Sequence, residues 1–219
     1  MAAPPSREAI TGLVLAGGRG QRLGGVDKGL QPWQGRALVD HAIERLAPQV
    51  ATIMISANRH LADYASRGAR VLADAQGDFP GPLAGMLAGL RAASTPWLAV
   101  VPCDSPRLPS DLVERLALGL GDRRGAVVAR DLGATGVRLE PVCCLLATAL
   151  ADDLADHLAG GGRKVEGWLA RHAAPVRFDR PGDAAAFANI NTPDDLGHWG
   201  ASSGRNRTAA SETSQTTSR

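Results

Sequence analysis

The sequence has few cysteines, no large excess of charge of either sign and no long apolar run. Its three cysteines, Cys103, Cys143 and Cys144, are odd in number and two are adjacent, which does not suit a disulfide framework or a zinc site. The net charge of +2 gives no reason to expect binding to nucleic acid or to a membrane surface. No stretch approaches the roughly 20 apolar residues that span a bilayer, and residues 1–10 lack the pattern of a secretory signal. We therefore expect a cytoplasmic protein with reduced thiols.

The length of 219 residues and the hydrophobic content of 44% suit one globular domain with a sizeable core. Residues 1–9 contain two prolines and few large apolar groups, so they predict a flexible lead. The folded domain is expected at residues 10–199. Residues 200–219 are rich in Ser and Thr and have almost no apolar side chains, which predicts a disordered tail.

Apolar patterns predict that strands alternate with helices over the first half of the chain. Strands are expected at residues 10–15, 50–55, 69–73 and 97–101, and helices at residues 38–46, through Tyr64, at 82–91 and at 108–118. Further strands or short extended segments are expected at residues 125–129, 142–146, 176–178 and 187–190, and helices at 152–158, 164–170 and 192–199. The alternation implies right-handed crossovers and an α/β fold, a three-layer α/β/α arrangement with a mostly parallel, Rossmann-like sheet.

The stretch from residue 13 to residue 30, LVLAGGRGQRLGGVDKGL, is the one around which the rest of the chain is organised. Its first three residues are apolar and suit a strand that is buried on both faces. Glycines with free backbone N–H groups follow, and cations are interleaved with them, a combination suited to binding polyphosphate. These residues are Gly17, Gly18, Gly20, Gly24 and Gly25, with Arg19, Arg22 and Lys28.

The spacing of this loop excludes two common phosphate-binding motifs. A dinucleotide fingerprint that starts at Gly18 requires glycine at position 23, where Leu23 stands. A Walker A loop that starts at Gly20 requires Lys followed by Ser or Thr after Gly25, where the chain has Val26 and Asp27.

Polar residues follow the predicted strands, and the carboxyl ends of parallel strands form the ligand-binding edge of an open α/β sheet. Asn58 follows the second strand, Asp74 the third and Asp104 the fourth. Since a triphosphate carries about four negative charges, Asp104 is expected to hold Mg²⁺ that bridges to the phosphates. Asn58 and Asp74 are candidates for the base and the ribose, and the sequence leaves open which of them contacts the base.

Other residue types offer less chemistry. The five histidines show no metal-ligand spacing, and no G-x-S-x-G nucleophile motif occurs, so covalent catalysis is not favoured. Gly85 and Gly89 lie within a predicted helix, where glycine costs stability relative to alanine. Either close packing or the approach of a ligand would explain them.

Five motifs together resemble those of the molybdenum cofactor guanylyltransferases, the MobA family of nucleotidyltransferases. They are LAGG-x3-R-x-GG-x-DKGL (residues 15–30), ANRH (57–60), PGPLAG (80–85), PCDSP (102–106) and NINTPDDL (189–196). The first is shared by many nucleotidyltransferases, whereas the combination is much narrower. The resemblance covers residues 10–199 and implies a nucleotide-diphospho-sugar transferase-like fold.

The resemblance implies transfer of GMP from GTP to the terminal phosphate of molybdenum-bound molybdopterin, with Mg²⁺ as cofactor and pyrophosphate as product. It assigns to GTP the residues Leu15, Ala16, Gly17, Gly18, Lys28, Asn58, Asp74 and Asp104. It assigns to the pterin substrate Arg22, Gly25, Asn189 and Asn191, to catalysis Arg22, Lys28 and Asp104, and to the metal Asp104. Expected partners besides the substrates are transient ones, proteins that load molybdopterin or chaperone molybdoenzymes, and the chain is expected to be a monomer.

The implied chemistry is an in-line displacement at the α-phosphorus. The acceptor phosphate is already an anion and needs no strong base, so catalysis should consist of positioning and charge neutralisation. Two kinds of alternative stay open at this point. One is a related nucleotidyltransferase that uses CTP or a sugar 1-phosphate acceptor, and the other is a non-catalytic GTP-binding module on the same fold.

Overall fold

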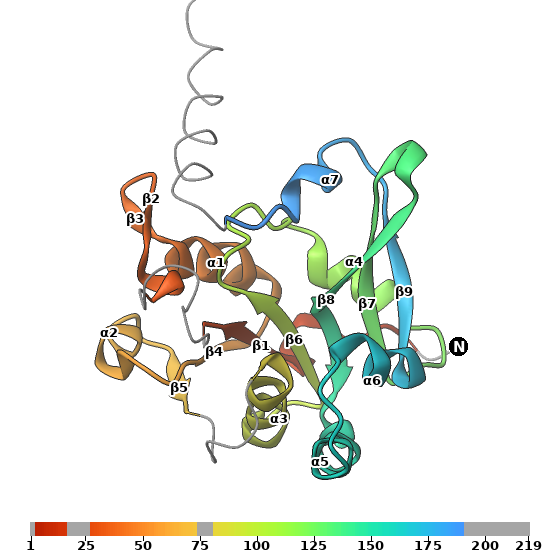
Figure 1. Ribbon diagram of the computed structural model, residues 1–219, viewed down its shortest axis with the longest axis horizontal. Helices are drawn as coiled ribbons and strands as arrows, with labels where there is room; N and C mark the ends of the chain where they lie inside the picture. Colours follow the sequence, from red (N-terminus) through yellow and green to blue (C-terminus); the bar gives the residue numbers. More distant parts are fainter. Residues whose placement is uncertain (1–2, 17–26, 74–80, 191–219) are drawn as a thin grey trace, which may run out of the picture. The chain divides into compact units, whose positions relative to one another are not determined.

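The computed structural model describes residues 3–16, 27–73 and 81–190 (Figure 1). Those up to Asn189 belong to one compact unit, and a second unit begins at Ile190. The predicted helix at 192–199 and the Ser/Thr-rich tail lie outside the described residues, so the predicted division of the chain stays a prediction. Among the helices that are described, none has the length and apolar character needed to cross a membrane.

A seven-stranded sheet with the order β5-β4-β1-β6-β8-β7-β9 forms the centre of this unit. The strands are β1 (Ile10–Leu15), β4 (Thr52–Ser56), β5 (Arg70–Leu72), β6 (Trp97–Pro102), β7 (Gly125–Asp131), β8 (Val137–Ala147) and β9 (Ala173–Phe178). Neighbouring strands are parallel except that β8 runs antiparallel to both β6 and β7. The prediction of a mostly parallel α/β sheet is therefore confirmed.

Helices cover both faces of the sheet, as Figure 1 shows, with α1 and α4 on one face and α3, α5 and α6 on the other. The helices are α1 (Leu38–Leu46), α2 (Leu61–Ala65), α3 (Pro82–Ala92), α4 (Leu112–Leu118), α5 (Ala151–Ala159), α6 (Val165–His172) and α7 (Asp183–Ala186). Short 3-10 helices are η1 (Arg7–Ala9), η3 (Lys28–Leu30), η4 (Ala47–Gln49), η5 (Gly133–Thr135) and η6 (Thr148–Leu150). The two faces have separate hydrophobic clusters, so the predicted three-layer arrangement is confirmed.

β1 lies between two parallel strands and is covered on both faces, which explains its continuous apolar sequence. Leu13 and Val14 are fully buried, one in each hydrophobic cluster. Gly12 lets α1 approach closely, because a Cβ at this position would lie 2.8 Å from Cδ2 of Leu46. The sequence therefore fixes a rigid strand directly before the glycine-rich loop.

Several elements differ from the sequence-based prediction. β8 begins at Val137 rather than at residue 142, and its added outer part is largely exposed. Residues 187–190 were expected to be extended but form no strand. The hairpin of β2 (Pro32–Trp33) and β3 (Arg36–Ala37) was not predicted, and neither was α7. Segments as short as these do not show the apolar periodicity on which the prediction depends.

Candidate active site

The carboxyl ends of four parallel strands meet at one edge of the sheet, and backbone hydrogen bonds hold their exits together. The Ala16 N–H donates to the Ser56 carbonyl (2.8 Å), and the Cys103 N–H donates to the Leu15 carbonyl (3.0 Å). On the outer side, the Ala57 N–H donates to the Leu72 carbonyl (2.9 Å). The residue after Cys103 is therefore kept beside the point where β1 ends and the glycine-rich loop begins.

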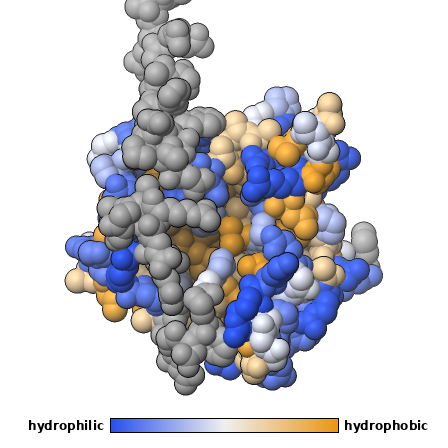
Figure 2. Space-filling model, in the orientation of Figure 1, coloured by the Kyte–Doolittle hydropathy of each residue, from blue (hydrophilic) through white to orange (hydrophobic). Residues whose placement is uncertain are grey.

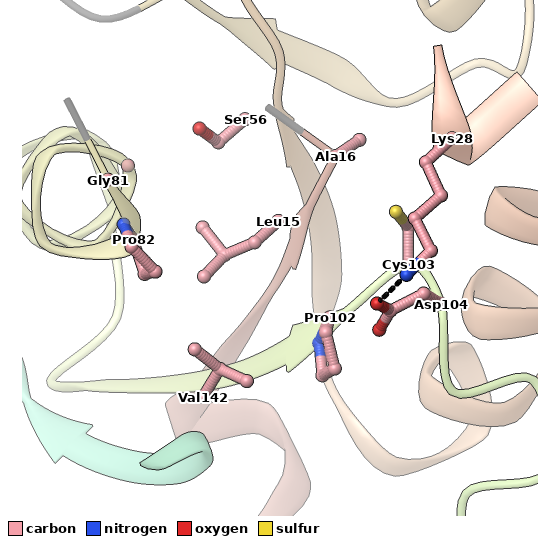
Figure 3. Close-up of a pocket in the computed structure, with 11 residues that line it drawn as sticks. Leu15, Ala16, Lys28, Ser56, Gly81, Pro82, Pro102, Cys103, Asp104 and Val142 are labelled. Atoms are coloured by element: carbon pink, nitrogen blue, oxygen red, sulfur yellow. Dashed lines mark hydrogen bonds and ion pairs between the residues drawn. The ribbon is translucent and has the colours of Figure 1, made fainter. Parts of the chain in front are cut away.

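A pocket opens at this edge (Figure 3). The described residues that line it are Leu15, Ala16, Lys28, Ser56, Gly81, Pro82, Gly85, Pro102, Cys103, Asp104 and Val142. Its volume is about 210 Å³, which is less than the ~300 Å³ at the lower end of typical ligand sites. The described residues thus enclose part of a nucleotide-sized ligand rather than all of it.

The pocket has an apolar side and a charged side. In Figure 3, Gly81 and Pro82 at the start of α3 lie across the pocket from Lys28 and Asp104. Figure 2 shows hydrophobic residues near the centre of the face in view, with hydrophilic residues around them. An arrangement of this kind suits a ligand with a flat, partly apolar group at one end and anionic groups at the other.

Gly85 explains how α3 comes so close to the sheet. A Cβ at Gly85 would lie 2.6 Å from the Ser56 Oγ and 2.8 Å from the Leu15 Cδ2, so alanine does not fit without movement. A Cβ at Gly89 would lie 2.5 Å from the Leu13 Cδ2, inside the core. Close packing therefore accounts for both glycines, and Gly85 also lines the pocket.

An ion pair closes the charged side of the pocket. The Lys28 Nζ lies 2.5 Å from the Asp104 Oδ2, and these side chains are 25% and 16% exposed. They are the two fully charged groups among the described lining residues. Lys28 comes from η3 and Asp104 from the turn after β6, so the pair connects residues 76 positions apart.

The second carboxylate oxygen of Asp104 is buried, and no described residue donates a hydrogen bond to it. A buried carboxylate oxygen without a donor is costly unless a ligand supplies the missing charge. Asp104 lines the pocket, so the site fits a small divalent cation that binds together with an anionic ligand. The described part of the chain contains no group of three His, Cys, Asp or Glu side chains placed to hold a metal.

Cys103 carries a thiol at the pocket, and its environment opposes a role as a nucleophile. Burial, and then the negative charge of Asp104, raise the pKa of the thiol well above its usual range. A thiol acts as a nucleophile in its ionised form. No histidine is among the described lining residues. The geometry therefore supports direct transfer between bound groups rather than a covalent intermediate.

The structure brings together four of the residues that the sequence assigned to the nucleotide, namely Leu15, Ala16, Lys28 and Asp104. Asn58 follows β4 at the same edge, where it is exposed and not among the described lining residues. The remaining candidates fall outside the described residues: Gly17, Gly18, Arg22, Gly25, Asp74 and Asn191.

Asn189 was assigned to the second substrate, and it lies next to the residue that follows Asp104. The Ser105 Oγ donates to the Asn189 Oδ1 at 2.8 Å. Ser105 is buried, whereas Asn189 is exposed. The segment that contains Asn189 is thus attached to the loop that carries the carboxylate.

Two lining residues, Ser56 and Val142, lie outside every motif identified in the sequence. Ser56 is the last residue of β4, and its strand position alone gives the signal that it lies at the ligand-binding edge. Val142 comes from β8, where the pairing with β7 shifts between Val127 and Val128 so that residues 141–143 bulge. A bulge turns side chains in a direction that simple alternation does not predict.

Comparisons with known proteins agree with this geometry. A family model described as the MobA-like NTP transferase domain matches residues 12–176. The molybdenum cofactor guanylyltransferase of Cupriavidus taiwanensis is 53% identical over 195 residues, which cover 87% of this chain and 96% of that protein. The protein of the same name from Cupriavidus necator is 54% identical over the same coverage. The crystal structure of molybdopterin-guanine dinucleotide biosynthesis protein A from Archaeoglobus fulgidus matches with a TM-score of 0.68 and 25% identity, over 86% of this chain and 95% of that one.

Proposed function

The chain belongs to the molybdenum cofactor guanylyltransferases of the MobA-like NTP transferase family, and we propose that it transfers GMP from GTP to the terminal phosphate of molybdenum-bound molybdopterin. The products are pyrophosphate and the guanine dinucleotide form of the molybdenum cofactor. One observation carries the proposal: the Asp104 carboxylate, paired with Lys28, borders a pocket that begins where β1 ends.

GTP binds with its phosphates at the charged side of the pocket and its base toward α3. Leu15, Ala16, Lys28 and Asp104 line this pocket together, which supports their assignment to the nucleotide. Gly17, Gly18, Asn58 and Asp74 complete the proposed nucleotide set. The hydroxyl group of Ser56 adds a polar group that can donate to or accept from the base or the ribose.

Asp104 is the residue that would hold Mg²⁺, through the buried oxygen that lacks a donor. Mg²⁺ in proteins commonly takes one or two carboxylates and completes its shell with phosphate oxygens and water. A single aspartate therefore suits a metal that enters with the nucleotide. When bound, the ion would neutralise charge on the phosphates of GTP.

The chain itself contributes positioning and positive charge. An oxygen of the acceptor phosphate bonds to the α-phosphorus, and the bond from the α-phosphorus to the β-phosphate oxygen breaks, so that pyrophosphate leaves with the electron pair. Asp104 keeps the Lys28 ammonium at the rim of the pocket, where it can meet the charge that grows on the leaving group. Arg22 is proposed to add a second cation. Since the acceptor is an anion, no general base is required.

The second substrate is proposed to contact Arg22, Gly25, Asn189 and Asn191. The hydrogen bond from Ser105 to Asn189 supports this arrangement, because it keeps Asn189 beside the loop of Asp104. A cytoplasmic location, a monomeric state and transient contacts with molybdopterin-loading or molybdoenzyme-chaperone proteins are proposed on the same family grounds.

The test measures pyrophosphate release from GTP with and without molybdenum-loaded molybdopterin, in the presence of Mg²⁺. We expect release that depends on the acceptor, on Mg²⁺ and on guanine, with a dinucleotide product of the correct mass. Parallel reactions with CTP, ATP and UTP, and with a sugar 1-phosphate as acceptor, measure specificity. A preference for CTP, or transfer to the sugar phosphate, would overturn the proposal.

A further inference from the structure

The turn that presents Lys28 is anchored by a buried carboxylate immediately before it. Asp27 is 8% exposed and precedes η3, and its Oδ1 accepts a hydrogen bond from the Gly29 N–H at 3.2 Å. The same oxygen accepts a second hydrogen bond, at 2.6 Å, from the Tyr64 hydroxyl group. One carboxylate oxygen therefore connects the turn of Lys28 to a helix 37 residues further along the chain.

Tyr64 fits this turn closely. Its side chain is completely buried, and a Cβ at Gly29 would lie only 2.4 Å from the Tyr64 hydroxyl oxygen. Glycine at position 29 thus lets the hydroxyl group reach Asp27. Burial, and then the hydrogen bond to Asp27, raise the pKa of Tyr64, so the phenol keeps its proton and remains a donor.

The turn directly after the helix of Tyr64 is itself held in place. The Arg67 Nε lies 2.5 Å from the Asp40 Oδ1 on α1, and the Arg67 guanidinium lies over the Tyr64 ring at 5.8 Å from its centroid. The hydroxyl group of Tyr64 therefore has a fixed position, and its hydrogen bond to Asp27 holds the turn that carries Lys28.

We propose that Asp27 and Tyr64 are positioning residues that act through Lys28. The Lys28 side chain is long and has many rotamers, so its ammonium can meet a developing charge reliably only if its backbone is fixed. The hydrogen bonds of Asp27 fix that backbone, and the Asp104 carboxylate fixes the other end of the side chain, 2.5 Å from Nζ. This inference rests on the proposed function, in which Lys28 neutralises charge on the phosphates.

Four variants separate this role from a general effect on folding. Tyr64→Phe keeps the ring and removes the hydroxyl group, whereas Asp27→Ala removes the acceptor. Asp27→Asn keeps an oxygen that can accept both hydrogen bonds. Thr11→Val is the matched control, because it removes the hydroxyl group of another buried residue, which lies in β1 and does not line the pocket. The Thr11 Oγ1 lies 2.8 Å from the Thr95 Oγ1.

Transfer kinetics provide the first readout. We expect Tyr64→Phe and Asp27→Ala to lower kcat about tenfold, with the Kd for GTP changed less than about threefold. Asp27→Asn should keep at least about a third of kcat, and Thr11→Val should leave kcat unchanged. In a Lys28→Ala background, Tyr64→Phe should lower kcat less than about twofold, because the residue through which it acts is already missing.

Acetylation of lysine provides a second readout that needs no turnover. The chain has two lysines, Lys28 and the exposed Lys164, so Lys164 serves as an internal reference in mass spectrometry. Loss of the anchor should free the ammonium of Lys28 from its charged partner. We expect the acetylation rate of Lys28 relative to Lys164 to rise at least about threefold in Tyr64→Phe and Asp27→Ala, but not in Asp27→Asn or Thr11→Val.

The outcomes distinguish the inference from the proposed function. If wild type forms the dinucleotide product but Tyr64→Phe lowers kcat equally with and without Lys28, or leaves both readouts unchanged, the positioning role is wrong. If wild type forms no product although the acetylation pattern changes as expected, the proposed function fails and the positioning of Lys28 stands. Should Tyr64→Phe not fold, the comparison of Asp27→Ala with Asp27→Asn decides.

Discussion

Two aspartates in this protein, the buried Asp183 and the partly buried Asp104, have opposite environments. Asp183 is satisfied by donors: the Arg115 guanidinium reaches its Oδ1 at 3.2 Å and its Oδ2 at 2.9 Å, and the Arg180 N–H donates to Oδ2 at 3.0 Å. Asp104 has Lys28 at one oxygen and no donor from the described residues at the other. Both oxygens of the Asp183 carboxylate, which joins α4 to α7, thus have hydrogen-bond donors. At Asp104, which lines the pocket, one oxygen has none among the described residues.

The difference distinguishes a carboxylate that stabilises the fold from a carboxylate that is available to a ligand. A buried carboxylate with all its hydrogen bonds made contributes to one folded arrangement, and removing it leaves its partner buried and unpaired. A carboxylate with an open oxygen offers that oxygen to a ligand, at some cost in stability. If the distinction holds, a substitution at Asp104 lowers activity, whereas a substitution at Asp183 lowers stability.

The largest effect is expected at Asp104. Asp104→Ala should lower the rate of GMP transfer about a thousandfold, since it removes both the proposed metal ligand and the anchor of Lys28. Pyrophosphate release at saturating GTP and Mg²⁺ measures the rate, and urea denaturation checks that stability changes little. Substantial Mg²⁺-dependent turnover by this variant would refute the role of Asp104.

The converse is expected at Asp183. Asp183→Ala should lower the free energy of unfolding by about 3 kcal/mol, because it removes the carboxylate that accepts two hydrogen bonds from the largely buried Arg115 guanidinium and leaves it only the Asp111 carboxylate at 3.9 Å and the Arg177 carbonyl. Transfer by the folded enzyme should not change. Urea denaturation measures the loss, and Arg180→Ala is the control: it removes an exposed ion pair with Asp111 and should cost less than about 1 kcal/mol. Similar losses in the two variants would contradict the distinction.

Lys28→Ala should lower kcat about a hundredfold while the Kd for GTP rises only about threefold. The reason is that the ammonium stabilises charge that grows in the transition state more than it stabilises bound GTP. Single-turnover kinetics and equilibrium titration with GTP separate the two quantities. An unchanged kcat at saturating GTP would show that Lys28 has no part in the chemical step.

The smallest effect concerns Cys144 in β8, a buried group with no proposed chemistry. Burial raises its pKa to about 12. In the unfolded chain the thiol ionises near pH 8.5, so above that pH the unfolded state binds fewer protons and stability falls. Between pH 8.5 and 9.5 this thiol should account for about 1 kcal/mol of lost stability. Cys144→Ala should show a loss smaller by that amount in urea denaturation, and an equal loss in both proteins would contradict the prediction.

Much of the fold could be predicted because its central elements have strong periodicity. The bounds of β1 and of α1 match the prediction residue for residue, since β1 is buried on both faces and α1 has one apolar side. The outer part of β8 was missed because its apolar residues are exposed and alternate with charged ones, so they form no continuous apolar run. α7 was missed because it has only four residues, and its importance depends on Arg115, 68 positions earlier in the chain.

The candidate site likewise contains residues that could be predicted from sequence motifs and residues that could not. Asp104 and Lys28 were found because they belong to motifs at the end of a predicted strand and in a glycine-rich loop. Ser56 was missed because the direction of the last side chain of a strand depends on register, which a sequence alone does not specify. Asp27 and Tyr64 were not assigned a role, since their contact joins segments 37 residues apart without any local pattern.

The tight contact of α3 at Gly85 has a consequence for how substrate choice could change. The distance between α3 and the sheet beside the pocket depends on the absence of a side chain at this position, because a Cβ there would collide with Ser56 and Leu15. A larger residue at position 85 would have to displace these two lining side chains or move α3 away from the sheet. A single mutation in the helix could therefore reshape the pocket without changing any charged residue.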